Sequence, residues 1–140
     1  MNHDPNCIFC KIIKGEISAI KVYENEETFA FLDITPIHPG HTLVIPKNHA
    51  SNIYEISEKD FLAVSKTVHT LAKAIKEGLK CEGINIYMNN EAPAGQVIFH
   101  SHIHIIPRFV NDGYEHWHGK RGIEKNLLEE AGEKIKNSLR

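Results

Sequence analysis

The chain lacks the features that mark several classes of protein. Among its 140 residues are only three cysteines, and its formal net charge of -2 shows no excess of lysine and arginine. Three cysteines do not build a disulfide framework, and this charge balance does not favour nucleic acid or an anionic membrane as a partner. The opening MNHDPNCIFCKIIKGE is too charged and too short of apolar residues for a secretory signal or a transmembrane helix. We therefore expect a cytoplasmic protein that binds neither nucleic acid nor membrane.

No repeat, low-complexity tract or linker divides the chain, so residues 1–140 are predicted to form a single domain. The hydrophobic periodicity predicts an α+β fold: a five-stranded antiparallel sheet, one long helix and a C-terminal helix, with the helices packed on one side of the sheet. The expected strands are 20–23, 28–33, 41–46, 84–89 and 97–106. The expected helices are 57–80, where Ser57 and Asp60 resemble a capping box, and 123–139.

Histidine is abundant, with ten residues, and three of them alternate in HSHIHII, residues 100–106. If this segment is a strand, His100, His102 and His104 project from one face. A solvated face would seldom be filled with histidine alone, so metal binding and catalysis remain as interpretations. A neutral imidazole is a ligand for zinc, and it can also attack phosphorus or shuttle protons near pH 7.

A Gly-Gln pair, Gly95 and Gln96, precedes these histidines. Glycine lets backbone N–H groups approach an anion closely, and phosphate is the natural anion for such a loop. Taken alone, the pair is more typical of an ordinary turn.

Three segments together resemble the histidine-triad (HIT) superfamily: GQVIFHSHIHII, FLDITPIHPGHTLVIPKNH (31–49) and the opening CIFCKIIKGEI. The resemblance spans residues 7–108, which we take as the core, and leaves 109–140 as a C-terminal extension. It implies a nucleotide-binding HIT-like fold that usually forms a homodimer, and hydrolysis or transfer of a nucleoside monophosphate. Cleavage in this family requires no catalytic metal.

The resemblance also implies roles for individual residues. His102 would be the nucleophile that forms a nucleotidyl-histidine, while His104 and His41 would contact the phosphate or assist proton transfer to the leaving group. Gln96 and the backbone near Val97 would hold phosphate oxygens. The full set implied for binding a purine nucleotide is Ile8, Phe9, Ile12, Phe31, Asp33, Ile34, Asn89, Gly95, Gln96, Val97, His102 and His104, with Asp33 accepting hydrogen bonds from the ribose hydroxyls.

The spacing of Cys7 and Cys10 suits a metal ion or a redox pair, but the redox pair would need a preceding strand that is absent here. In HIT relatives that keep these cysteines, the other two zinc ligands correspond to His49 and His100. Four protein ligands would make the zinc structural.

The substrate stays open at this level. A nucleoside 5'-phosphoramidate of the AMP type and a dinucleoside polyphosphate are both compatible with the motifs. A nucleotide-binding scaffold without catalytic activity is the alternative from a different class of protein.

Overall fold

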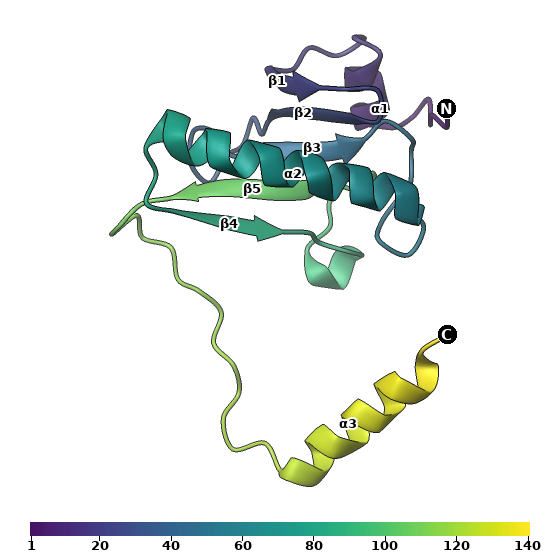
Figure 1. Ribbon diagram of the computed structural model, residues 1–140, viewed down its shortest axis with the longest axis vertical. Helices are drawn as coiled ribbons and strands as arrows, with labels where there is room; N and C mark the ends of the chain where they lie inside the picture. Colours follow the sequence, from purple (N-terminus) through teal and green to yellow (C-terminus); the bar gives the residue numbers. More distant parts are fainter.

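The computed structural model describes residues 1–140 and has five strands, all antiparallel, in the order β1-β2-β3-β5-β4 (Figure 1). This confirms the predicted α+β class and the HIT-like sheet. The strands are β1 (Lys21–Glu24), β2 (Thr28–Leu32), β3 (Thr42–Pro46), β4 (Gly83–Tyr87) and β5 (Ile103–Arg108). The helices are α1 (Ile8–Ile13), α2 (Glu58–Leu79), α3 (Lys125–Ser138) and a 3-10 turn, η1 (Ala92–Ala94).

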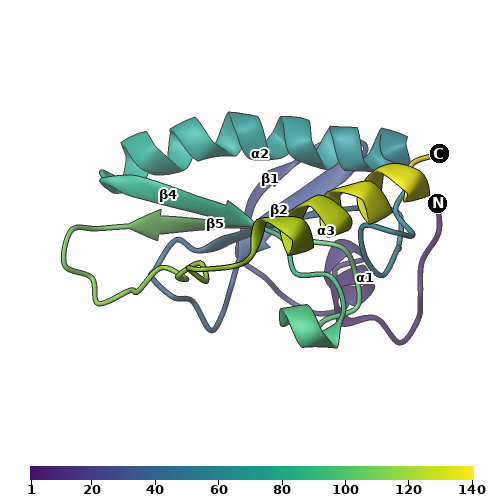
Figure 2. The same cartoon turned by 90° about the horizontal axis from the view of Figure 1, so that it is seen from below.

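Both faces of the central strands are covered, which explains the continuous apolar runs in β2 and β3. Alternate side chains point to opposite faces of the sheet. The face toward α1 buries Phe29, Phe31, Leu43 and Ile45 with Phe9, and the face toward α2 buries Ala30, Val44, Ile103 and Ile105 with Val64, Val68 and Leu71. Figure 2 shows α2 and α1 on opposite sides of the sheet. The expectation that the helices share one side was therefore wrong.

Helix α2 begins and ends as its sequence indicates. The Ser57 hydroxyl accepts a hydrogen bond from the backbone N–H of Asp60 at 3.1 Å, and the chain leaves the helix at Lys80 in the left-handed conformation. The carboxylate of Asp60 does not close a reciprocal capping box, because it accepts instead from the amide of Asn48 at 3.1 Å. Each large side chain on the buried face of α2 contributes about 1.5–3 kcal/mol to stability.

The strand predicted for 97–106 is shorter at its start, because β5 begins at Ile103. The preceding residues pair with a loop: the backbone N–H and the hydroxyl of Ser101 both donate to the carbonyl of Ala50, at 2.7 and 3.0 Å. The first two histidines of the triad therefore precede the strand. Only His104 lies within it, opposite Leu43 of β3 and on the face toward α1.

After β5 the chain leaves the body of the molecule as an extended arm, residues 109–140, which ends in α3 (Figure 1). No residue of α3 is buried, and Trp117 in the arm is 83% exposed. None of the helices combines the length and the apolar character needed to cross a bilayer.

Candidate active site

A cleft of about 430 Å³ opens on the side of the sheet that carries α1. Its wall is mostly apolar and comes from α1, from the end of β2 and from the segment before β5, which suits a flat ring that is buried edge-on. The structure brings together here every residue predicted to bind nucleotide except Gln96: Ile8, Phe9, Ile12, Phe31, Asp33, Ile34, Asn89, Gly95, Val97, His102 and His104.

His102 lies at the inner end of the cleft with one ring nitrogen engaged. Its Nδ1 lies 2.6 Å from the carbonyl oxygen of His100, which only accepts, so Nδ1 carries the proton and Nε2 keeps its lone pair. The ring of Phe9 meets the imidazole edge to face, with centroids 5.3 Å apart. Burial lowers the pKa of His102, which keeps the ring neutral and Nε2 nucleophilic at neutral pH.

His104 and His41 form a directional hydrogen-bond chain. The backbone N–H of Ile37 donates to Nδ1 of His41 at 3.2 Å, so His41 carries its proton on Nε2 and donates it to Nδ1 of His104 at 2.8 Å. The proton of a neutral His104 is then on Nε2, a buried atom that has no partner within the chain. Burial, reinforced by the neighbouring imidazoles, lowers the pKa of His104 to about 4. His104 therefore offers one unused N–H donor in the cleft beside His102.

Asp33 lines the cleft close to His41. One carboxylate oxygen accepts from the backbone and the hydroxyl of Thr35, at 2.9 and 3.1 Å. The other lies 3.7 Å from Nε2 of His41. Asp33 thus keeps acceptor capacity on the cleft side for a hydroxyl-bearing ligand.

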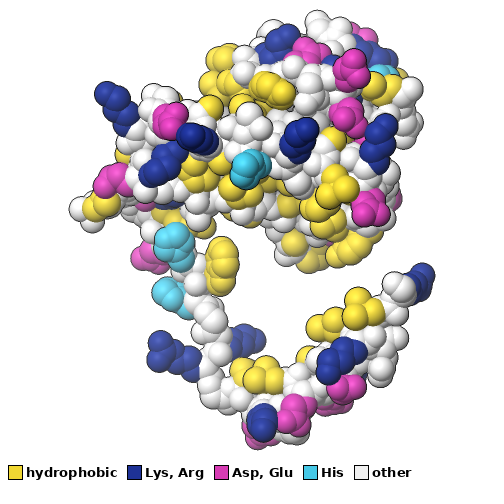
Figure 3. Space-filling view, in the orientation of Figure 1, with side chains coloured by type: hydrophobic (Ala, Val, Ile, Leu, Met, Phe, Trp, Pro, Cys, Tyr) yellow, Lys and Arg dark blue, Asp and Glu magenta, His cyan; other side chains and the backbone are white.

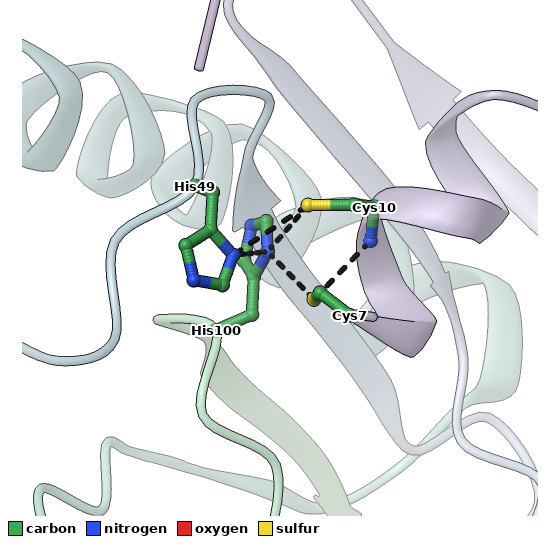
Figure 4. A group of neighbouring side chains, drawn as sticks. All are labelled: Cys7, Cys10, His49 and His100. Atoms are coloured by element: carbon green, nitrogen blue, oxygen red, sulfur yellow. Dashed lines mark hydrogen bonds between the residues drawn. The ribbon is translucent and has the colours of Figure 1, made fainter. Parts of the chain in front are cut away.

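A second cluster, drawn in Figure 4, consists of Cys7, Cys10, His49 and His100. Nδ1 of His100 lies 3.4 Å from Sγ of Cys7, 3.6 Å from Sγ of Cys10 and 3.2 Å from Nδ1 of His49. Tetrahedral zinc with ordinary bond lengths separates two nitrogens by ~3.3 Å and a nitrogen from a sulfur by ~3.6 Å. The four donors therefore fit a zinc ion without rearrangement.

Neighbouring groups of the protein keep the lone pairs of these donor atoms available to a cation. Nε2 of His100 donates to the carbonyl of Pro46 at 2.8 Å, which leaves the Nδ1 lone pair directed at the cluster. Burial lowers the pKa of His100 to about 4, so this lone pair is free at neutral pH. Asp4 approaches the outer nitrogen of His49 at 3.9 Å, where a carboxylate can orient a ligating imidazole.

Comparison with known proteins agrees with this geometry. The HIT domain model matches residues 14–111, and protein hit of Bacillus subtilis is 48% identical over 110 residues, which cover 78% of this chain and 76% of that protein. The chain belongs to the HIT family. The crystal structure of SMU.412c from Streptococcus mutans superposes with a TM-score of 0.94 at 37% identity, over 99% of this chain and 88% of that one.

Two further HIT relatives have names that describe a function or a ligand. The adenosine 5'-monophosphoramidase of Candida albicans is 42% identical over 110 residues, covering 74% of this chain and 70% of that protein. A zinc-bound histidine triad family protein of Mycobacterium smegmatis superposes with a TM-score of 0.76 at 33% identity, over 96% of this chain and 98% of that one.

Gln96 does not reach the cleft of this HIT protein, contrary to the sequence expectation. Its side chain is buried: Oε1 accepts from the backbone N–H of Glu91 at 2.7 Å, and Nε2 donates to the carbonyls of Ser51 and Ile98 at 2.5 and 3.1 Å. Glu91 has φ 72°, a region that a non-glycine residue rarely adopts. Gln96 therefore holds a strained loop in place, and the loop presents Gly95 and Val97 to the cleft.

The sequence did not predict Tyr87, which contacts a cleft histidine. It also did not predict seven residues that line the cleft: Ile17, Ser18, Ala19, Leu32, Thr35, Leu43 and Ile98. The ring of Tyr87 stacks on the imidazole of His104, with centroids 4.9 Å apart, because Tyr87 of β4 lies directly opposite His104 of β5. The pairing register that brings them together cannot be predicted from the sequence of either segment alone. By contrast, Asn89 lines the cleft as predicted, whereas the side chain of its neighbour Asn90 accepts a hydrogen bond from the backbone N–H of Ile53 at 2.8 Å.

Proposed function

We propose that the protein hydrolyses conjugates in which AMP is joined to an amine or a related leaving group, by way of a nucleotidyl-histidine on His102. The observation that carries the proposal is the complementary protonation of the two cleft imidazoles. His102 has a free Nε2 lone pair, and His104 beside it has a free Nε2–H. A nucleophile next to a donor for the oxygen on which charge develops is what acyl and phosphoryl transfer require.

In the first step, the Nε2 lone pair of His102 attacks the α-phosphorus. The bond from phosphorus to the leaving group breaks, and the departing amine nitrogen keeps the electron pair and takes up a proton from solvent. The imidazole becomes cationic as the new P–N bond forms. Its Nδ1–H then makes a charge-assisted hydrogen bond to the carbonyl of His100, which is already only 2.6 Å away in the free protein. The backbone thus stabilises the intermediate without moving.

The protonation of the ring pair favours one of the two roles expected for His104. His104 and His41 share one proton per ring, and the pKa of His104 is about 4, so the pair is neutral at pH 7. A neutral His104 that surrendered its Nε2 proton would become an anion. We therefore assign His104 as a hydrogen-bond donor to a phosphoryl oxygen, with His41 fixing its tautomer.

The second step consumes one water molecule. Its oxygen attacks phosphorus, the P–N bond to His102 breaks, and the electron pair returns to Nε2. The hydroxyl of the water ends on phosphorus to give AMP, and its remaining hydrogen goes to solvent as a proton, which balances the proton that the amine took up in the first step. His102 is regenerated in its starting state.

Recognition of the nucleotide follows from the two ends of the cleft. The apolar residues Ile8, Phe9, Ile12, Phe31 and Ile34 would enclose the purine, and Asp33 would accept from the ribose hydroxyls. Gly95 and Val97, with Asn89, would face the phosphate from the loop that Gln96 holds. A monophosphoramidase among the relatives supports an adenylate as substrate.

Zinc at Cys7, Cys10, His49 and His100 completes the proposal. The match between the observed donor separations and tetrahedral geometry supports it, as does the zinc-bound relative. With four protein ligands the ion has no open position, so it would hold the fold together rather than take part in cleavage. We further propose that the protein is a cytoplasmic homodimer.

Turnover of an AMP phosphoramidate that releases a fluorogenic amine tests the proposal. His102→Ala should lower kcat by on the order of 10³-fold or more, while AMP still binds within a few-fold of the wild-type affinity. His69→Ala, an exposed change on α2, is the matched control and should leave turnover unchanged. Rapid quenching of the wild type should trap an adenylyl group on His102.

Two results would contradict this assignment. Undiminished turnover in His102→Ala would place the nucleophile elsewhere. AMP binding by the wild type without turnover of phosphoramidates, adenylylsulfate or dinucleoside polyphosphates would favour a nucleotide-binding scaffold.

A further inference from the structure

The segment that carries His102 has little backbone support of its own. β5 begins only at Ile103. From residue 97 to 102 the backbone makes a single hydrogen bond to another backbone group, which runs from the N–H of Ser101 to the carbonyl of Ala50 at 2.7 Å. A residue within a strand would be held in register by the ladder of its neighbour. His102 therefore depends on other contacts for its position.

The side chain of Ser101 doubles this single bond. Its hydroxyl donates to the same carbonyl of Ala50 at 3.0 Å, and the residue is only 1% exposed. A carbonyl oxygen has two lone pairs, so it can accept both hydrogen bonds. One hydrogen bond sets a distance and leaves the segment free to turn about it, whereas two bonds from one residue restrict that turn. The hydroxyl therefore fixes the orientation of the segment.

Ala50 belongs to a loop that also holds two other parts of the site. One residue earlier, His49 lies in the cluster of Figure 4, with Nδ1 3.2 Å from Nδ1 of His100. One residue later, the carbonyl of Ser51 accepts from the side-chain amide of Gln96 at 2.5 Å. Three successive residues of one loop therefore contact the cluster, the segment before β5 and the loop that faces the cleft.

The peptide group between His100 and Ser101 links this anchor to the imidazole of the cleft. Its C=O accepts the Nδ1–H of His102 at 2.6 Å, and its N–H is the one that donates to Ala50. A trans peptide group is planar, so its N–H and its C=O point in opposite directions. Holding the N–H on Ala50 therefore also holds the carbonyl that orients His102.

We propose that Ser101 is a positioning residue for the nucleophile: its hydroxyl holds the peptide group after His100, and with it the imidazole of His102, in the orientation for attack. This inference rests on the proposed role of His102 and deepens it. Ser101 does not line the cleft, so it acts through its neighbours and not on the substrate. An apolar residue at this position would keep the backbone bond to Ala50 and lose the second one.

Three substitutions separate the hydroxyl from the volume of the side chain. Ser101→Ala removes the hydroxyl, while Ser101→Thr and Ser101→Val add nearly the same volume and differ in whether a hydroxyl is present. Ser65→Ala is the matched control, because Ser65 of α2 also donates to a backbone carbonyl, that of Phe61 at 2.9 Å. Helix α2 crosses the front of the body in Figure 3, on the opposite side of the sheet from α1.

Turnover of a fluorogenic AMP phosphoramidate measures the effect on the reaction. Ser101→Ala and Ser101→Val should lower kcat about tenfold, because a less well oriented nucleophile attacks more slowly. KM and the affinity for AMP should stay within about twofold of the wild type, because Ser101 does not line the cleft. Ser101→Thr should recover most of the kcat that Ser101→Val loses, and Ser65→Ala should match the wild type throughout.

Nitrogen-15 NMR of histidine-labelled protein gives a second readout that does not depend on turnover. The signals of His102, assigned by comparison with His102→Gln, should show the proton on Nδ1 in the wild type, in Ser101→Thr and in Ser65→Ala. In Ser101→Ala and Ser101→Val they should show a mixture of the two tautomers, because the carbonyl that holds this proton is less firmly placed. Should Ser101→Ala fold poorly, the comparison of Ser101→Thr with Ser101→Val decides in the same way.

Each contrary outcome has a distinct meaning. Wild-type kcat and a single His102 tautomer in Ser101→Ala and Ser101→Val would overturn the role of Ser101 and leave the proposed reaction intact. A parallel loss of kcat, AMP affinity and bound zinc would make Ser101 a structural residue and would also overturn its positioning role. If the wild type turned over no adenylate, the proposed reaction would fall, and the tautomers alone would decide whether Ser101 positions His102.

Discussion

At the residue scale, backbone groups decide what each imidazole of the cleft can do. The carbonyl of His100 fixes the proton of His102 on Nδ1, and the N–H of Ile37 fixes the proton of His41 on Nε2. The two cleft histidines are thereby given opposite functions, one as a lone pair and one as an N–H donor. Loss of either backbone contact would leave the tautomer of the histidine that it holds unfixed.

Because His104 is buried in its neutral form, the stability of the protein should depend on pH. Its pKa in the folded protein is about 4, below the ordinary value of 6.5, so between these values the unfolded chain binds more protons. The free energy of unfolding should therefore fall as the pH drops from about 6.5 toward 4. In urea denaturation at pH 7 and pH 5, His104→Gln should lose about 1–2 kcal/mol less than the wild type. Equal losses in the two proteins would show that His104 is not held neutral.

Gln96 provides a second prediction at this scale. Gln96→Ala would leave the N–H of Glu91 and the carbonyl of Ser51 without their partners. We expect a loss of about 2–3 kcal/mol in unfolding free energy, measured by denaturant titration. Val97→Ala, at a side chain that is 80% exposed, is the stability control. If Gln96 instead held the phosphate, its replacement would lower turnover and leave stability unchanged.

The sequence was a good guide to which residues surround the cleft and a poor guide to what their side chains do there. The segments around His102, Asp33 and Phe9 could be placed because their motifs resemble a family. The orientation of Gln96 depends on how the loop from Glu91 closes, which is a tertiary property. The stacking of Tyr87 on His104 depends on the register between β4 and β5.

At the scale of elements, α1 contributes to both the cleft and the Cys7, Cys10, His49 and His100 cluster. Cys7 caps the helix, its sulfur accepting from the N–H of Cys10 at 3.4 Å, while Ile8 and Phe9 between them line the cleft. The first triad histidine joins the same cluster and also holds His102 through its carbonyl. Metal binding and nucleotide binding should therefore be coupled through one short helix.

Removal of the metal tests this coupling. In Cys10→Ser, or after chelation, α1 loses its anchor, and the affinity for AMP should fall about tenfold as the packing of Ile8 and Phe9 weakens. Calorimetric titration with AMP, together with zinc analysis, provides the measurement. Cys81→Ser, outside the cluster, should retain zinc and AMP affinity. Unchanged AMP affinity in metal-free protein would show that α1 keeps its position without the ion.

Regular elements were predicted where periodicity is strong, and short ones were not. The 22-residue helix α2 matches its predicted range closely, because its apolar face and its Ser57 cap agree. Helix α1 has only six residues and is held by Cys7, so periodicity could not reveal it. The segment 97–102 alternates like a strand, but its partner is the carbonyl of Ala50 and not a neighbouring strand.

At the scale of the whole molecule, the protein consists of a folded body and an extended arm. The helix at the end of this arm, α3, buries no residue within the chain. The sequence predicted α3 from its periodicity. It could not predict that α3 would lie apart from the sheet. An amphipathic pattern indicates that a helix has an apolar face, but it does not indicate which surface that face contacts.

The proposed homodimer predicts a stability that depends on protein concentration. Dissociation releases two copies of the chain, so mass action should raise Tm by roughly 2 °C for each tenfold increase in concentration. Scanning calorimetry over two decades of concentration measures this. A Tm that is independent of concentration would contradict the homodimer.

The position of Trp117 has a practical consequence for spectroscopy. It is the single tryptophan of the chain and lies in the arm, 83% exposed, far from the cleft histidines. Intrinsic fluorescence excited at the red edge of protein absorption will therefore report the arm and remain nearly silent about the nucleotide site. A change in emission on dilution would record a change in the surroundings of the arm while the body is still folded.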